Sequence, residues 1–287
     1  MNAKVYFSKE ITPQKVLELY QLTGETLAGN VAVKVHSGEK GNQNFLHPEF
    51  WRPVIDHVKG TVVECNTAYR GHRNTTELHK QLLVDHGWNK YFPVDLLDAE
   101  GPDLILDIPN GKRIQKDHVG KDIVNYDSML VLSHFKGHPM GGFGGALKQL
   151  SIGLASSYGK KYIHGAGDTN DFWHADHDSF LESMADAASA IIDYFRGNIV
   201  YVNVMKNMSV DCDCCAVAED PCIADIGILV STDPVAIDQA CVDLVYACSD
   251  PGKPHFLERI ESRNGVHTIE AAEQMGCGSR KYELIEI

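Results

Sequence analysis

The pattern of hydrophobic and polar positions along the chain alternates between segments with helical periodicity and short apolar runs. Helical periodicity predicts helices over Thr12–Thr26, Thr75–His86, Ala146–Ser156, Phe180–Phe195, Pro234–Ala247, His255–Arg263 and Thr268–Met275. Short apolar runs between them are typical of buried strands, at Val31–Val35, Gly60–Cys65, Asp103–Asp107, Met129–Leu132, Ile199–Val204, Ile226–Val230 and Tyr282–Ile287. This alternation predicts an α/β fold with a mainly parallel or mixed sheet flanked by helices, as one domain over residues 1–287 or as two lobes with a cleft.

Two of the predicted helices have clear start signals. Thr12 precedes Pro13, and Asp233 precedes Pro234, so each pair combines a capping side chain with a first-turn proline. Residues 157–178 are instead rich in Gly, His and Asp, and this composition predicts a long loop.

Composition and charge narrow the classes of partner. The formal net charge is −13, which disfavours nucleic acid and anionic membrane surfaces because both are bound through Lys and Arg. No stretch approaches the ~20 apolar residues of a membrane span, and no apolar run follows Met1–Glu10. We therefore expect a soluble, cytoplasmic protein that binds neither nucleic acid nor membrane, while a local site for a small anion is compatible with this charge.

Half of the eight cysteines fall within eleven residues, at Cys212, Cys214, Cys215 and Cys222. Thiolates are soft ligands, so this cluster predicts a metal ion or an iron–sulfur centre. The spacing matches neither the paired motifs of zinc ribbons nor the cluster motif of bacterial ferredoxins, so the metal stays open. Two alternatives are buried structural cysteines and a redox or persulfide-carrying thiol group.

A second concentration of chemistry is the glycine-rich segment from Ser133 to Lys148. It is predicted to link a strand to a helix, where the amides at Gly142, Gly144 and Gly145 can approach an anionic ligand or cofactor. Lys136 and Lys148 supply positive charge there, and His138 is a candidate general acid or base. The alternative is a tight turn with surface histidines.

Several stretches, in this order, resemble the bacterial and archaeal family called domain of unknown function 362, whose members are often described as ferredoxin or iron–sulfur proteins. They are Val31–Asn42, Ser133–His138, Gly142–Lys148, Asp211–Cys215 and Asp225–Ala240. Many members carry a ferredoxin module after the stretch that corresponds to Gly153–Lys161, but residues 158–178 contain no cysteine here. The resemblance therefore implies that electrons, if needed, come from an external redox partner.

A more distant resemblance is to the catalytic domain of lactate racemase, which uses a nickel pincer cofactor. The spacing of His138, Lys148 and His164 matches a catalytic His, a cofactor-anchoring Lys and a nickel-binding His of that enzyme. His72 lies in a stretch similar to the loop that bears its other catalytic His. The resemblance implies a small carboxylate-bearing ligand, and two functions stay open: a metal- or redox-dependent enzyme, or a non-catalytic zinc- or cluster-binding scaffold.

Overall fold

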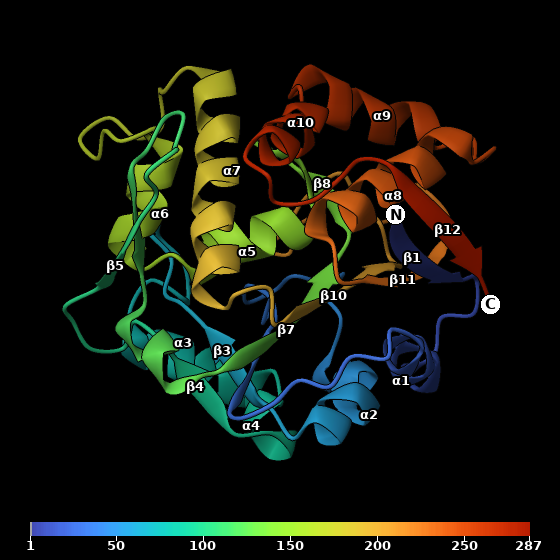
Figure 1. The fold of residues 1–287 in the computed structure, drawn as a ribbon, viewed down its shortest axis with the longest axis horizontal. Helices are drawn as coiled ribbons and strands as arrows, with labels where there is room; N and C mark the ends of the chain where they lie inside the picture. Colours follow the sequence, from blue (N-terminus) through green and yellow to red (C-terminus); the bar gives the residue numbers. More distant parts are fainter. Residues whose placement is uncertain (1) are drawn as a thin grey trace.

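The computed structural model describes residues 2–287, which form a three-layer α/β fold around one large sheet (Figure 1). The sheet has eight strands in the order β12-β1-β11-β10-β7-β2-β3-β4. Their bounds are β1 Ala3–Ser8, β2 Val31–Lys34, β3 Thr61–Glu64, β4 Val94–Leu96, β7 Ser128–His134, β10 Ile199–Met205, β11 Gly227–Ser231 and β12 Tyr282–Glu286. Strand β11 is antiparallel to β1 and β10, and all other neighbours are parallel, which confirms the predicted mixed sheet.

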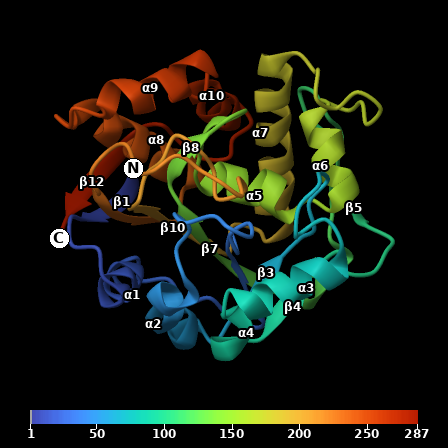
Figure 2. The same cartoon turned by 180° about the vertical axis from the view of Figure 1, so that it is seen from behind.

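Helices cover both faces of this sheet (Figures 1 and 2). Helices α1 (Pro13–Leu22), α2 (Pro48–Val58), α3 (Thr76–Asp85) and α4 (Trp88–Tyr91) lie on one face, where Leu19 and Trp51 are buried with Val33 of β2. On the other face lie α5 (Ala146–Leu154), α7 (His177–Tyr194), α8 (Pro234–Ala247) and α10 (Val266–Gln274), and there Leu150 and Ala188 join the larger apolar core. Burial of both faces explains why the central strands are almost wholly apolar.

Smaller elements complete the fold. Helices α6 (Ser157–His164) and α9 (Lys253–Ser262) pack outside the main layer, and a 3-10 turn spans Lys121–Asn125. Two short hairpins pair β5 (Leu104–Asp107) with β6 (Lys116–Val119), and β8 (Lys136–His138) with β9 (Gly142–Gly144). None of the helices between residues 2 and 287 has the length and apolar content to cross a membrane.

The local start signals in the sequence are confirmed. Thr12 accepts a hydrogen bond from the amide of Lys15 at the start of α1, and Asp233 caps α8. The loop predicted for residues 157–178 is wrong in its first third, because Ser156 caps α6 by accepting the amide of Gly159. The segment before α5 was expected to be a plain loop and instead contains the β8–β9 hairpin.

Candidate functional site

A cavity of about 240 Å³ lies where the carboxyl ends of β2, β3 and β7 meet the loop that follows β10. This is the edge at which open α/β sheets usually bind ligands. The cavity joins the two chemical segments of the sequence, since the glycine-rich segment and the cysteine loop both line it. Its lining residues with polar or reactive side chains are Lys34, His36, Glu64, Cys65, Thr67, Tyr69, Arg73, His138, Lys148, Gln149, Lys160, His164, Cys214 and Cys215.

The glycines before α5 serve close packing. A Cβ at Gly145 would lie 2.3 Å from Oδ1 of Asp238, and the two carboxylate oxygens of Asp238 accept the amides of Ala146 and Leu147 at 2.8 and 3.0 Å. Burial raises the pKa of Asp238 to about 6. Gly142 (φ +77°) packs directly on Gly265. The first amides of α5 thus already have a protein carboxyl as hydrogen-bond partner.

Lys136 does not line the cavity. Its buried ammonium lies 2.9 Å from Oδ2 of Asp213, and Nδ1 of His134 lies 2.9 Å from Oδ1 of the same carboxylate. Burial alone would raise the pKa of Asp213, but His134 and Lys136 hold it well below its usual range. Because Asp213 stands between Cys212 and Cys214, this buried ion pair fixes the cysteine loop.

The cysteine loop presents its thiols in two groups. Ligand atoms of His138, Cys212 and Cys214 all lie within 4.8 Å of one another, so these three residues could hold one metal ion. The backbone amide of Cys214 donates to Sγ of Cys212 at 3.4 Å. Cys215 faces the same cavity, whereas Sγ of Cys222 lies against the carbonyl of Met208 at 3.7 Å, outside both the triad and the cavity wall.

The hydrogen bonds of His138 determine which ring nitrogen carries the proton. Its Nδ1 accepts the amides of Met140 (3.2 Å) and Gly141 (2.8 Å), and burial lowers its pKa to about 4, so the ring is neutral with the proton on Nε2. A ligating His usually donates from its second nitrogen. The two thiols are therefore the stronger metal ligands of the triad, and His138 as placed presents an N–H to its surroundings.

His164 has the opposite arrangement. Its Nδ1 donates to the carbonyl of Lys160 at 2.6 Å, and burial lowers its pKa to about 4, so the lone pair is on Nε2. The ring is held between Phe180, stacked at 5.0 Å, and Trp173, edge-on at 5.5 Å. His164 can thus act as a base or a metal ligand, which is consistent with its predicted role.

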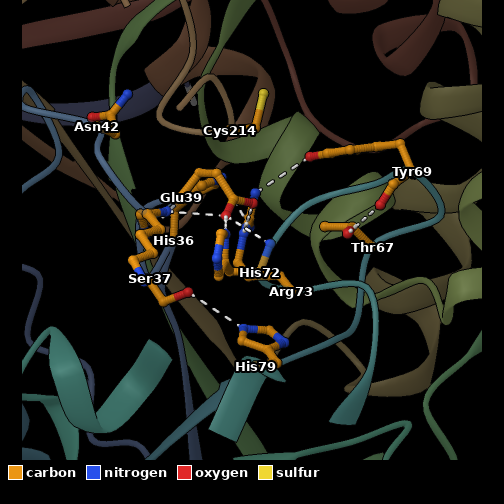
Figure 3. A network of polar contacts seen from close by, with 12 residues as sticks. His36, Ser37, Glu39, Asn42, Thr67, Tyr69, His72, Arg73, His79 and Cys214 are labelled. Carbon is orange, nitrogen blue, oxygen red and sulfur yellow. Dashed lines mark hydrogen bonds and ion pairs between the residues drawn. The ribbon is translucent and has the colours of Figure 1, made fainter. Parts of the chain in front are cut away.

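His72 does not line the cavity, and His36 does. The His72 ring is 49% exposed with Nδ1 3.6 Å from Glu39, while its amide donates to the same carboxylate (Figure 3). Arg73 links this carboxylate to the cavity, because its guanidinium also approaches His36 Nε2 (3.4 Å) and the hydroxyl of Tyr69 (3.3 Å). The general acid–base role predicted for His72 is not supported by any contact with the cavity.

A buried pair at the floor of the cavity, Lys34 and Glu64, was not predicted from the sequence. They end the neighbouring strands β2 and β3, and Nζ of Lys34 lies 2.6 Å from Oε2 of Glu64. Gly153 on α5 makes room for this lysine, since a Cβ there would lie 2.7 Å from Cε of Lys34. The sequence did contain a signal for this pair, since each of two apolar strand runs ends in a charged residue. Such residues meet at the edge of the sheet formed by the carboxyl ends of the strands.

Residues 31–243 match a family model described as Domain of unknown function (DUF362). No curated protein matches the chain. Among solved structures, the chain is similar to the lactate racemase apoprotein from Thermoanaerobacterium thermosaccharolyticum, with 13% identity, a TM-score of 0.51, and coverage of 84% of this chain and 56% of that one. A protein from Thermotoga maritima aligns at 13% identity and a TM-score of 0.46, covering 93% of this chain and 60% of that one.

The chain thus spans a little over half the length of both similar structures. At 13% identity, the likeness to the lactate racemase apoprotein shows a shared fold. The resemblance to the family predicted from the sequence is confirmed by the match to the family model, and the resemblance to lactate racemase is confirmed as a shared fold.

Proposed function

The chain belongs to the family described as Domain of unknown function (DUF362), and from this premise we propose that it is a metal-dependent enzyme acting on a small anionic molecule. The observation that carries the proposal is the convergence of Lys148, His138, His164 and the thiol of Cys214 on one cavity. Concave sites with a few convergent polar groups are where small ligands bind.

Lys148 is the proposed anchor of the anion. It lies in the first turn of α5 and lines the cavity, and its ammonium forms no hydrogen bond or ion pair with any residue between 2 and 287. An ammonium without a protein partner favours a carboxylate or phosphate of a ligand. The fold shared with the racemase and the matching spacing of His138, Lys148 and His164 support a carboxylate-bearing ligand.

The two cavity histidines divide the proton chemistry between them. His138 presents an N–H and His164 presents a lone pair, both on neutral rings at neutral pH. One can donate a proton and the other can accept one without a prior change of charge. This pairing suits proton transfer to and from a small molecule held at Lys148.

The proposed metal ligands are the thiolates of Cys212 and Cys214, with the His138 ring beside them. Thiolates and imidazole suit zinc, nickel, copper or iron, and such an ion would polarise the ligand or support its redox chemistry. The buried pair of Lys136 and Asp213 holds the loop in place for this role.

The proposal is tested by anaerobic purification, metal analysis and titration with small carboxylates. Cys212→Ser and Cys214→Ser are expected to abolish metal binding, His138→Gln to weaken it less, and the matched control Cys222→Ser to leave it unchanged. Lys148→Ala should abolish anion binding while the metal stays bound. Unchanged anion binding in Lys148→Ala would remove the assignment of the anchor.

A non-catalytic metal-binding scaffold is the second candidate. It is favoured by the engagement of the α5 amides by Asp238, which removes one common source of anion binding at a helix start. Colourless protein with one tightly held zinc ion and no affinity for small anions would support the scaffold. Broad absorption near about 400 nm would instead indicate an iron–sulfur cluster.

A further inference from the structure

Positive side chains outnumber carboxylates on the wall of the cavity. Four cationic groups line it, on Lys34, Arg73, Lys148 and Lys160, and Glu64 is the single carboxylate among the lining residues. Removing an ammonium from water without a compensating charge is costly, so the distribution of partners among these groups decides what ligand the cavity favours.

Two of the four cations are neutralised by the protein. Nζ of Lys34 lies 2.6 Å from Oε2 of Glu64, and both side chains are at most 4% exposed. Nε of Arg73 lies 3.3 Å from Oε2 of Glu39, which approaches from behind the cavity wall. These pairs contribute no net charge to the site.

The other two cations have no carboxylate partner. Nζ of Lys160, on α6, donates to the carbonyl of Ala155 at 2.5 Å and forms no ion pair with any residue between 2 and 287. The ammonium of Lys148, on α5, forms neither a hydrogen bond nor an ion pair within the same residues. Both lysines line the cavity together with His164, and both positive charges lower the pKa of His164 after the larger effect of burial.

Carboxyl groups near Lys160 form no ion pair with it. The oxygens of Asp98 accept the amides of Asn66 (2.8 Å) and Ser157 (3.1 Å); burial raises the pKa of Asp98, and the positive charge of Lys160 opposes that rise. Burial raises the pKa of Asp117 to about 8, so this carboxyl is protonated at neutral pH. A divalent metal held by two thiolates is neutral in sum, so a loaded metal site does not itself compensate the two ammonium charges.

From this imbalance we infer that the ligand of the cavity is a small dianion, with one negative charge for Lys148 and one for Lys160. The inference rests on the proposed function and narrows its ligand to a short dicarboxylate or a phosphate. Pro139, Met140, Ile152 and Trp173 form an apolar part of the same wall, which offers the two charges no solvation.

Calorimetric titration of the metal-loaded protein tests the inference, at constant ionic strength, with malonate, inorganic phosphate and the monoanion acetate. The dianions are expected to bind at least about tenfold more tightly than acetate. Lys160→Gln should lower dianion affinity about tenfold and acetate affinity by less than twofold, and Lys148→Gln should lower both. Lys161→Gln is the matched control, since Lys161 lies on the same helix but does not line the cavity.

The three ligands distinguish failure of the dianion inference from failure of the proposed function. Tighter binding of malonate assigns a dicarboxylate, and tighter binding of phosphate assigns a phosphate ester. If acetate binds as tightly as both dianions, the dianion inference fails while the proposed function stands; if no anion binds, the proposed function fails with it. Should Lys160→Gln not fold, judged by its thermal unfolding, the dianion preference of wild type and Lys148→Gln still decides the question.

Discussion

The charge state of Asp117 offers a direct test of the electrostatics around the cavity. Neither oxygen of this buried carboxyl has a hydrogen-bond partner among residues 2–287, and burial raises its pKa from 3.8 to about 8. Above about pH 4 the unfolded chain releases this proton while the folded chain keeps it. The folded state therefore binds more protons in this window, and the stability contributed by Asp117 falls as pH rises toward about 8.

The magnitude follows from the pKa difference. Each pKa unit corresponds to about 1.4 kcal/mol, so ionisation of Asp117 in the unfolded chain lowers the stability of the fold by about 4 kcal/mol at pH 7. Asp117→Asn removes the titrating group and keeps the shape of the side chain. The variant should match wild type near about pH 4 and exceed its stability by a few kcal/mol at about pH 7 to 8.

Urea unfolding followed by tryptophan fluorescence, at several values between about pH 4.5 and 8, measures this difference. Subtracting the variant from wild type removes the pH dependence of all other groups. A difference that does not change with pH would show that Asp117 is ionised in the folded protein. In that case it would also compensate Lys160, and the argument for a dianion would lose one of its supports.

Three further predictions concern the framework of the site. Gly153→Ala should displace Lys34 and destabilise the fold by about 1–3 kcal/mol, measured by urea unfolding, because a Cβ there would lie 2.7 Å from Cε of Lys34. Lys136→Met should leave the buried Asp213 with one cationic partner fewer and cost about 3–5 kcal/mol, together with a loss of metal affinity that equilibrium dialysis would detect. Glu182 is buried, yet Lys112, Arg113 and His267 hold its pKa at about 2. Its contribution to stability is therefore present above about pH 4.5 and is lost as pH falls toward about 2. Glu182→Gln should reduce the loss of stability in that pH window, and an unchanged pH dependence of acid unfolding would contradict this role of Glu182.

Local signals predicted the elements that depend on local chemistry. The cap and proline pairs at Thr12–Pro13 and Asp233–Pro234 mark helix starts because they satisfy amides of the same helix. Helix α6 escaped prediction because it is only eight residues long, contains a glycine and adjoins a stretch rich in Gly, His and Asp; it packs on α7 and β6. Strand β1 was missed for a related reason, since its register is set by β11 and β12 at the other end of the chain.

In the candidate site, too, the sequence predicted local features but not the contacts between distant segments. The residue types of the cysteine loop and of the glycine-rich segment marked both as chemical, but spacing alone does not show which side chains converge. Cys222 is close in sequence to Cys215 and yet does not line the cavity with it, and most of the residues between the two cysteines are exposed. His36 and Arg73 come together across two strands, so only the fold reveals that they belong to the cavity wall.

The contacts that hold the cysteine loop in place affect how a metal ion would enter the site. Lys136 and His134 hold Asp213, and the amide group of Asn42 donates to the carbonyl of Cys215 at 2.8 Å, so contacts within the protein order the loop. In zinc fingers, by contrast, folding depends on the ion itself. Here a chelator would empty the site and leave the surrounding architecture standing. The metal could then be exchanged or delivered late, to a chain that has already folded.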